Sequence, residues 1–290
     1  MILPSGVSRG PGNGALERVR VETPRVRGDV YLHGAHVTAW QPAEQAPVLW
    51  VSRESQFKTD APIRGGVPIC FPWFAAHPTD PSAPAHGFAR LGAWRLTDAS
   101  VDGDRIEVRL AWRDDQATRR SPWPHPFAAE YRVSFGDQLS LALDVSNTGD
   151  APISFEAALH TYFAVSDIRR VTVTGLAGTE YLDKVEGLAS KRQGEAPIRF
   201  TGETDRIFLD TEATCTIHDP GLGRRIRVAK RGSLSTIVWN PWIAKARAMP
   251  DFGNDEWPEM LCIETANVRD RAVRLEPGSH HTMSAHIHLD

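Results

Sequence analysis

The sequence has little of several features that mark particular protein classes. It contains only three cysteines, Cys70, Cys215 and Cys262, an odd number with wide spacing. This pattern gives neither a disulfide framework nor a zinc knuckle, and we expect buried thiols. An excess of charge of one sign is also lacking, because 33 basic and 36 acidic residues leave a formal net charge of -3. Overall charge therefore gives no basis for binding nucleic acid or an anionic membrane, and any anion must be recognised locally.

Long apolar runs are missing as well. No stretch approaches the roughly 18 apolar residues of a membrane span, and Pro4 ends the apolar start at Met1–Leu3 before a signal-peptide core can form. We therefore expect a soluble cytoplasmic protein with no membrane or nucleic-acid partner. Long amphipathic helices with caps are absent too, which argues against an α/β fold.

Short β-patterned runs, separated by turn residues, make up much of the chain. The 23 glycines and 21 prolines are spread between these runs instead of forming one linker. Apolar residues take every second position at 105–110, 139–145, 224–228 and 273–275. Such alternation is typical of half-buried strands. Turn residues at 135–138 and 147–150 predict antiparallel neighbours. The sequence therefore predicts an all-β sandwich or barrel.

The length of 290 residues corresponds to roughly two average domains, but one large all-β fold can also hold it. Residues 1–14 are rich in glycine and proline, and we expect them to form a loosely ordered lead-in. We found no internal repeat or low-complexity segment. We therefore expect one domain spanning residues 15–290.

Two residues stand out inside predicted strands. In residues 152–163 the odd positions are apolar, so His160 lies on the opposite strand face and points away from the predicted core. A lone histidine there is usually a surface or hydrogen-bonded structural residue. Glu264 is the only acid in the uncharged run 261–266. A carboxylate at such a position is costly unless it is functional or paired with an arginine.

Two loop-like segments place an arginine near glycine. Arg64 precedes Gly65 and Gly66, and Arg90 follows His86 by four residues. Glycine permits close approach of a ligand to the backbone, and a guanidinium can hold phosphate or carboxylate oxygens at two points. The alternative for each arginine is an ion pair with a nearby acid.

Trp73, Trp239 and Trp242 lie in or beside these unusual segments. Their flat faces suit sugar rings, although core packing is the commoner role of any one tryptophan. Near the end of the chain, His286 and His288 share a strand face, and His280 and His281 precede them. No matching acid or cysteine spacing accompanies these histidines, so we expect no metal site.

Five segments resemble, in this order, the hexose-6-phosphate mutarotases, also called glucose-6-phosphate 1-epimerases, a branch of the aldose 1-epimerase superfamily. They are IRGGVPICFPWF at 63–74, HGFAR at 86–90, LHTYF at 159–163, VWNPW at 238–242 and CIE at 262–264. The resemblance extends over nearly the whole chain after residue 15. It implies a galactose-mutarotase-like β-supersandwich of antiparallel strands with few short helices and a sugar site on one concave sheet face.

The resemblance also implies roles for single residues. His160 matches the family's catalytic acid and Glu264 its catalytic base. Arg64 and Arg90 match phosphate-binding arginines, His86 a second active-site histidine and Asp205 a sugar-contacting acid. We add Trp239, from the fourth segment, as a substrate-binding aromatic residue. No cofactor and no metal is implied, and the expected substrate is a sugar phosphate bound by a monomer.

The chemistry of anomer interconversion needs these residue types. Breaking the C1–O5 bond requires a proton at O5 and removal of the proton from the C1 hydroxyl, so an acid and a base must flank one ring. This predicts an isomerase that interconverts the anomers of glucose 6-phosphate and related aldohexose 6-phosphates. Two alternatives remain at this point: a mutarotase for free sugars such as galactose, and a carbohydrate-binding protein of the same fold without catalysis.

Overall fold

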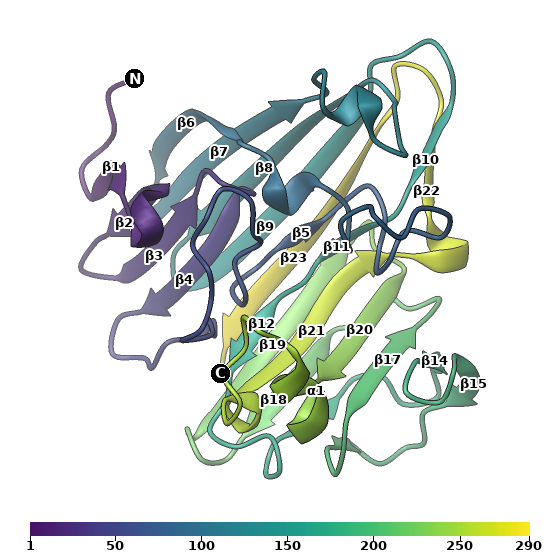
Figure 1. The fold of residues 1–290 in the computed structure, drawn as a ribbon. Coiled ribbons are helices and arrows are strands. Elements are labelled where there is room, and N and C mark those ends of the chain that lie inside the picture. Colours follow the sequence, from purple (N-terminus) through teal and green to yellow (C-terminus); the bar gives the residue numbers. More distant parts are fainter.

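The computed structural model describes all 290 residues, and its strands form four sheets in which every strand pairing is antiparallel (Figure 1). The nine-stranded sheet runs in the order β16 (Ile198–Arg199), β13 (Thr172–Thr174), β18 (Cys215–Asp219), β19 (Arg224–Arg231), β23 (His280–Leu289), β9 (Gln138–Asn147), β8 (Phe127–Phe135), β7 (Arg105–Arg113) and β6 (Arg95–Asp102). This sheet contains three of the four runs that alternation predicted.

The eight-stranded sheet runs in the order β15 (Ala189–Arg192), β14 (Glu180–Asp183), β17 (Thr204–Phe208), β20 (Ser235–Asn240), β21 (Met260–Asn267), β11 (Ala157–Leu159) and β5 (Ile69–Cys70), and β12 (Tyr162–Ala164) also pairs with β21. A two-stranded sheet joins β10 (Ile153–Phe155) to β22 (Val273–Leu275). The fourth sheet contains β1 (Val7–Pro11), β2 (Glu17–Glu22), β3 (Val26–Tyr31) and β4 (His36–Pro42).

Helices contribute little to this fold, as the lack of amphipathic periodicity predicted. The only α-helix is α1 (Trp242–Ala248), and the 3-10 turns cover Asn13–Ala15, Ala89–Leu91, Thr118–Arg120, Trp257–Glu259 and Arg269–Arg271. No helix combines the length and the apolar composition required to cross a bilayer.

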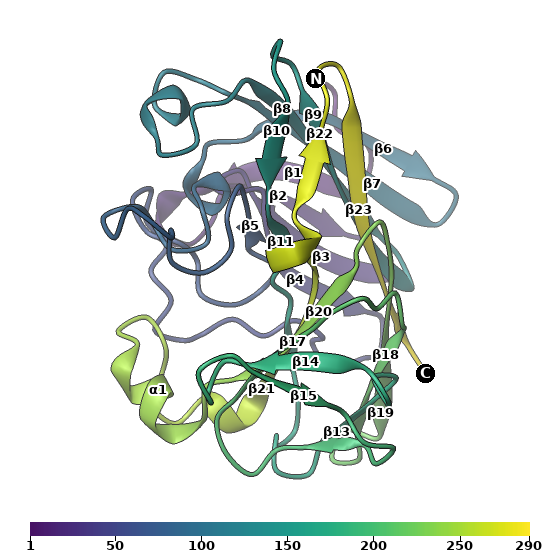
Figure 2. The same cartoon turned by 90° about the vertical axis from the view of Figure 1, so that its right-hand side faces the viewer.

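The strand sequences explain the layers. Along β8 and β9 buried and half-buried residues alternate, so one face of the nine-stranded sheet packs inward. By contrast, every residue of β20 and β21 is buried, so these strands are covered on both faces. Viewed from the side, β19 and β23 lie in a layer beside β20 and β21 (Figure 2). One apolar cluster of 70 buried residues includes side chains from all four sheets.

Two details differ from the expectations. The predicted lead-in at residues 1–14 contains β1, which pairs over its whole length with β2, because its backbone completes an edge that β2 would otherwise leave open. The turn at 147–150 does not lead to a neighbouring strand of β9. Instead β10 pairs with β22, while β9 pairs with β8 and β23. The hairpin predicted at 135–138 joins β8 and β9.

Candidate active site

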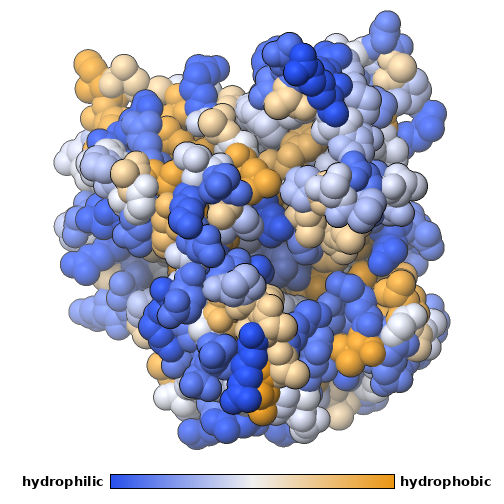
Figure 3. Space-filling view, viewed as in Figure 1, coloured by the Kyte–Doolittle hydropathy of each residue, from blue (hydrophilic) through white to orange (hydrophobic).

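A cavity of about 220 Å³ opens on one face of the eight-stranded sheet. All seven residues predicted from the sequence line it: Arg64, His86, Arg90, His160, Asp205, Trp239 and Glu264. The remaining lining residues are Phe74, Ala85, Lys184, Lys245 and Met249. In the space-filling view, this side of the molecule is hollowed near its middle, with hydrophilic side chains in the depth (Figure 3). The structure therefore brings together residues that are up to 200 positions apart in the chain.

The strand register brings Asp205, Trp239 and Glu264 to the same face of the eight-stranded sheet. Asp205 on β17 lies opposite Trp239 on β20, which lies opposite Cys262 on β21. Because side chains two residues apart share a strand face, Glu264 points to the same side as Cys262. The carboxylates of Asp205 and Glu264 thus face one space from strands separated only by β20.

His160 and Glu264 are in direct contact. Nε2 of His160 lies 3.4 Å from Oε1 of Glu264, and the two residues are 7% and 1% exposed. Burial, together with the neighbouring charge of Asp205, raises the pKa of Glu264 well above its ordinary value, and Lys184 opposes this effect. Burial and the nearby His86 and the arginines lower the pKa of His160 well below 6.5. The two groups are therefore held close together with their charged forms disfavoured.

A break in the strand directs His160 into the cavity. β11 ends at Leu159 and β12 starts at Tyr162, and between them the His160 amide donates to the carbonyl of Pro68 at 3.0 Å. The imidazole stacks on the Tyr162 ring, with centroids 4.8 Å apart and planes 9° apart. Trp239 meets both rings edge-on. These contacts fix the imidazole plane, while Nδ1 of His160 is buried without a hydrogen-bond partner.

His86 is held in one orientation and one tautomer. The Ala75 amide donates to Nδ1 of His86 at 3.4 Å, and Sγ of Cys70 lies 3.4 Å from the same nitrogen. Because Nδ1 accepts, the proton of the neutral ring belongs on Nε2. Burial, followed by the charges of Arg90 and Lys184, lowers the pKa of His86 well below 6.5. His86 is thus a neutral hydrogen-bond donor at the cavity wall.

The two arginines of the cavity differ in their partners. Arg64 pairs with Asp251 at 3.0 Å and donates to the hydroxyl of Tyr162 at 3.1 Å. Arg90 donates only to the carbonyl of Ala85, at 2.7 Å, and forms no ion pair. The ion-pair alternative therefore applies to Arg64, whereas Arg90 is a half-buried cation without a carboxylate partner.

The glycines beside Arg64 are required by the fold. Gly65 and Gly66 have φ values of +110° and +60°, and a Cβ at either would lie 2.4 Å or less from the backbone of Trp50, Val51 or Val37. Only glycine fits at such distances in the left-handed region. The close approach predicted from these glycines therefore occurs between neighbouring backbone segments.

Two lysines in the cavity were not predicted. Lys184 follows β14 and pairs with Asp205 at 2.8 Å, and Lys245 on α1 pairs with Glu203 at 2.8 Å. Nothing in their local sequence distinguishes them from solvated surface lysines. Their positions follow only from the pairing of β14 with β17 and from the position of α1.

Other sequence candidates lie outside the cavity. Trp73 is buried, with Nε1 donating to the carbonyl of Pro84, and Trp242 packs against Trp257 with centroids 4.3 Å apart. Among the late histidines, His286 lies near Ser140 and His288 near Asp290. No group of three or more His, Cys, Asp or Glu side chains has an arrangement suited to a metal ion.

Comparison with known proteins gives the family. The family model described as Aldose 1-epimerase matches residues 17–288. The chain belongs to the aldose 1-epimerase family. Relatives from Escherichia coli and Cenchrus ciliaris, each named "Putative glucose-6-phosphate 1-epimerase", are 34% and 37% identical to it. The alignments cover 94% and 86% of this chain and 90% and 77% of those proteins.

A solved structure extends the likeness to the whole fold of this aldose 1-epimerase family member. The crystal structure of a "putative mutarotase" from Salmonella typhimurium is 31% identical, with a TM-score of 0.92. It covers 99% of this chain and 95% of the Salmonella chain. The predicted β-supersandwich is therefore confirmed.

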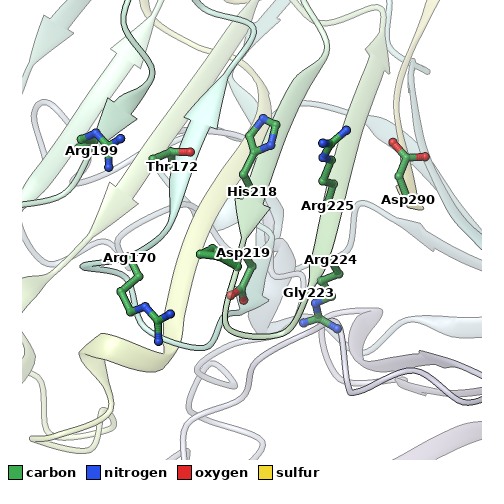
Figure 4. Close-up of a pocket in the computed structure, with 10 residues that line it drawn as sticks. Arg170, Thr172, Arg199, His218, Asp219, Gly223, Arg224, Arg225 and Asp290 are labelled. Carbon is green, nitrogen blue, oxygen red and sulfur yellow. The ribbon is translucent and has the colours of Figure 1, made fainter.

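This family member has a second, larger hollow of about 540 Å³ on the nine-stranded sheet (Figure 4). Arg224 there donates to the carbonyls of Ala46, Pro47 and Ala164. Its role is therefore structural, because it links the chain at residues 46–47 to β12. The guanidiniums of Arg170, Arg199 and Arg225 are exposed and make no ion pair or hydrogen bond. The hollow contains no paired acid and base comparable to His160 and Glu264.

Proposed function

We propose that this protein is a hexose-6-phosphate mutarotase that interconverts the α and β anomers of glucose 6-phosphate and related aldohexose 6-phosphates. The observation that carries the proposal is the His160–Glu264 pair in a cavity that also holds Arg90 without a carboxylate partner. The pair supplies acid–base chemistry, and the free guanidinium supplies a place for an anion. The names of the relatives support the same reaction.

In the proposed reaction the sugar ring binds with its C1–O5 bond beside the pair. His160 gives a proton to O5 while Glu264 takes the proton of the C1 hydroxyl, and the C1–O5 bond breaks. The product is the open-chain aldehyde. Rotation about C1–C2 and attack of the C5 hydroxyl on the other aldehyde face close the ring, with the two proton transfers reversed. Nε2 of His86 donates a hydrogen bond to the sugar near C1.

The pair needs one mobile proton for this cycle. Because burial disfavours both charged forms, the proton is shared between two groups 3.4 Å apart, and the apparent pKa values belong to the pair. A bell-shaped dependence of kcat/KM on pH follows: activity falls at low pH when the pair gains a second proton, and at high pH when it loses its only one.

Arg90 and Arg64 bind the 6-phosphate in this proposal. Arg90 offers its guanidinium directly, whereas Arg64 shares its charge between the phosphate and Asp251. Asp205 accepts hydrogen bonds from sugar hydroxyls, and Trp239 forms the wall beside the ring. Acid–base ring opening needs no cofactor or metal, so dialysis against a strong chelator should leave the rate unchanged.

A mutarotase for free sugars is the second candidate, since the same pair would serve a neutral sugar. The unpaired Arg90 favours the phosphorylated substrate, because even partial burial makes a cation costly unless an anion compensates it. A purely carbohydrate-binding role has less support, because it needs no acid and base in contact. We also propose a cytoplasmic location and a monomeric state, which fractionation and gel filtration with light scattering test.

The deciding experiment follows anomerisation of glucose 6-phosphate and galactose side by side by NMR exchange spectroscopy. We expect acceleration of the first and much weaker acceleration of the second. Faster exchange of galactose would favour the free-sugar mutarotase, and no acceleration of either sugar would favour the binding protein.

A further inference from the structure

Two carboxylates, Asp205 and Glu264, are buried in the same small cavity, 4% and 1% exposed. Placing two negative charges close together in a region of low dielectric is unfavourable, and one of them would ordinarily take up a proton. A catalytic base must nevertheless be ionised. The cavity therefore needs a cation dedicated to these carboxylates.

Lys184 is positioned to be that cation. β14 pairs with β17 up to Asp183 and Arg206, so the next residues in register are Lys184 and Asp205. The Lys184 amide donates to the Asp205 carbonyl at 2.9 Å, and its Nζ lies 2.8 Å from Oδ2 of Asp205. The ammonium also lies 5.6 Å from the centre of the Phe74 ring, a cation–π contact that helps to hold it in place. Backbone and side chain together hold the lysine beside the aspartate.

The other charged groups that line the cavity with Glu264 are His160 from the β11–β12 turn, Asp205 from β17, Lys245 from α1, Arg64 and His86 from loops and Arg90 from a 3-10 turn. Three further titratable groups lie near Glu264, and burial raises the pKa of each, so they stay neutral: Cys70 on β5, Tyr162 on β12 and Cys262 on β21. Among the cations, Arg64 is paired with Asp251, and Lys245 is paired with Glu203 and lies 3.9 Å from Asp205. Arg90 is unpaired, but a bound phosphate would take its charge. When a sugar phosphate is bound, Lys184 is therefore the cation that remains to balance the charges of Asp205 and Glu264.

We propose that Lys184 is a positioning residue that balances charge in this site: by neutralising Asp205 it makes ionisation of Glu264 less unfavourable beside a second buried carboxylate. The inference rests on the proposed function for its catalytic meaning, but the charge relation itself belongs to the protein without substrate. The lowering effect of Lys184 on the pKa of Glu264 supports it.

The test titrates Glu264 directly by NMR in protein labelled with ¹³C at the glutamate side-chain carboxyls. Glu264→Gln identifies the signal. We expect Lys184→Met to move the Glu264 titration to higher pH by about one unit or more, and Lys184→Arg to keep it within about half a unit of wild type. Asp205→Asn should move it to lower pH, and the double variant Lys184→Met/Asp205→Asn should return it toward the wild-type value.

Lys191→Met is the matched control. Lys191 pairs with Asp183 at 3.0 Å in the same β14–β15 hairpin, and neither of these residues lines the cavity. A shift in Lys191→Met as large as in Lys184→Met would overturn the proposal, as would an unchanged titration in folded Lys184→Met. If Lys184→Met fails to fold, Lys184→Gln removes the same charge with a polar side chain and decides in the same way.

Kinetics provide the second readout. In Lys184→Met the bell-shaped pH profile of kcat/KM, which reports the His160–Glu264 pair, should move to higher pH, with Lys184→Arg restoring it. A uniform loss at every pH without movement would mean that Lys184 contacts only substrate, which overturns the proposal. If wild-type protein does not anomerise sugar phosphates while the titration shifts as expected, the proposed function fails and the charge relation stands.

Discussion

Two hollows of this molecule are lined by the same kinds of side chain but differ in how those side chains are held. In the cavity of the eight-stranded sheet, His160, Asp205 and Glu264 are buried, His86 is half-buried, and each is fixed by a partner or a stacked ring. In the larger hollow of the nine-stranded sheet, Arg199 and Arg225 extend from strands and Arg170 from the turn before β13, all without partners. Neither the size of a hollow nor its number of arginines therefore identifies a site. Burial with fixed geometry does, because it changes the chemistry of the groups.

The test with the largest expected effect on kcat removes the acid or the base of the cavity. Glu264→Gln retains the shape but removes the base, and His160→Ala removes the proton donor. Either variant should lower kcat for glucose 6-phosphate by at least about 10²-fold, measured by NMR exchange. In the other hollow, His218→Ala should leave kcat near wild type. A folded Glu264→Gln or His160→Ala with normal turnover would show that the pair is not catalytic.

The second test compares the arginines of the two hollows by their effect on substrate choice. Arg90→Ala and Arg64→Ala should each lower kcat/KM for glucose 6-phosphate by about 10- to 100-fold, chiefly through KM, since each loses a charge-assisted contact. Exchange of free glucose should hardly change, and lysine at either position should restore only part of the loss. An unchanged ratio of kcat/KM for the two sugars in both alanine variants would favour the free-sugar mutarotase.

A third test addresses stability near the cavity. His36 donates from Nε2 to the Gly65 carbonyl at 2.7 Å, and its Nδ1 is buried without a partner. Burial lowers its pKa to about 3. The unfolded chain therefore takes up a proton near pH 6.5 that the folded protein takes up only near pH 3, and stability is lost as the pH falls between these values.

This linkage should remove about 2 kcal/mol from the free energy of unfolding between pH 6.5 and pH 5. Urea unfolding at several pH values measures the slope. His36→Asn retains a donor for Gly65 and should flatten the slope, even if it lowers stability at pH 7. An equal slope in both proteins would place the acid sensitivity elsewhere.

The smallest expected effect concerns the outer hollow. Arg199→Ala and Arg225→Ala remove exposed guanidiniums, so the free energy of unfolding should change by no more than about 0.5 kcal/mol. kcat/KM for glucose 6-phosphate should stay within about twofold of wild type. A tenfold loss would mean that the nine-stranded sheet takes part in binding, and the comparison between the two hollows would no longer hold.

Sequence reasoning predicted the strands and the candidate residues better than their surroundings. Alternation at 105–110 and 139–145 gave β7 and β9, because one face of each strand is half exposed. Alternation could not reveal β10 pairing with β22, since that contact joins segments about 120 residues apart. Lys184 and Asp251 escaped notice for the same reason: each acquires its partner only through tertiary contacts.

The complete burial of β21 has a consequence for how such a protein changes over time. All eight residues from Met260 to Asn267 are enclosed, so the strand that carries Glu264 has almost no freedom to accept new side chains. His86, Arg90 and Lys245, in contrast, come from a loop, a 3-10 turn and α1, outside the strands of the sheet. Selection for a different sugar would therefore act on these connecting segments, whose backbone can change without disturbing the sheet, and leave the strand that carries Glu264 as it is.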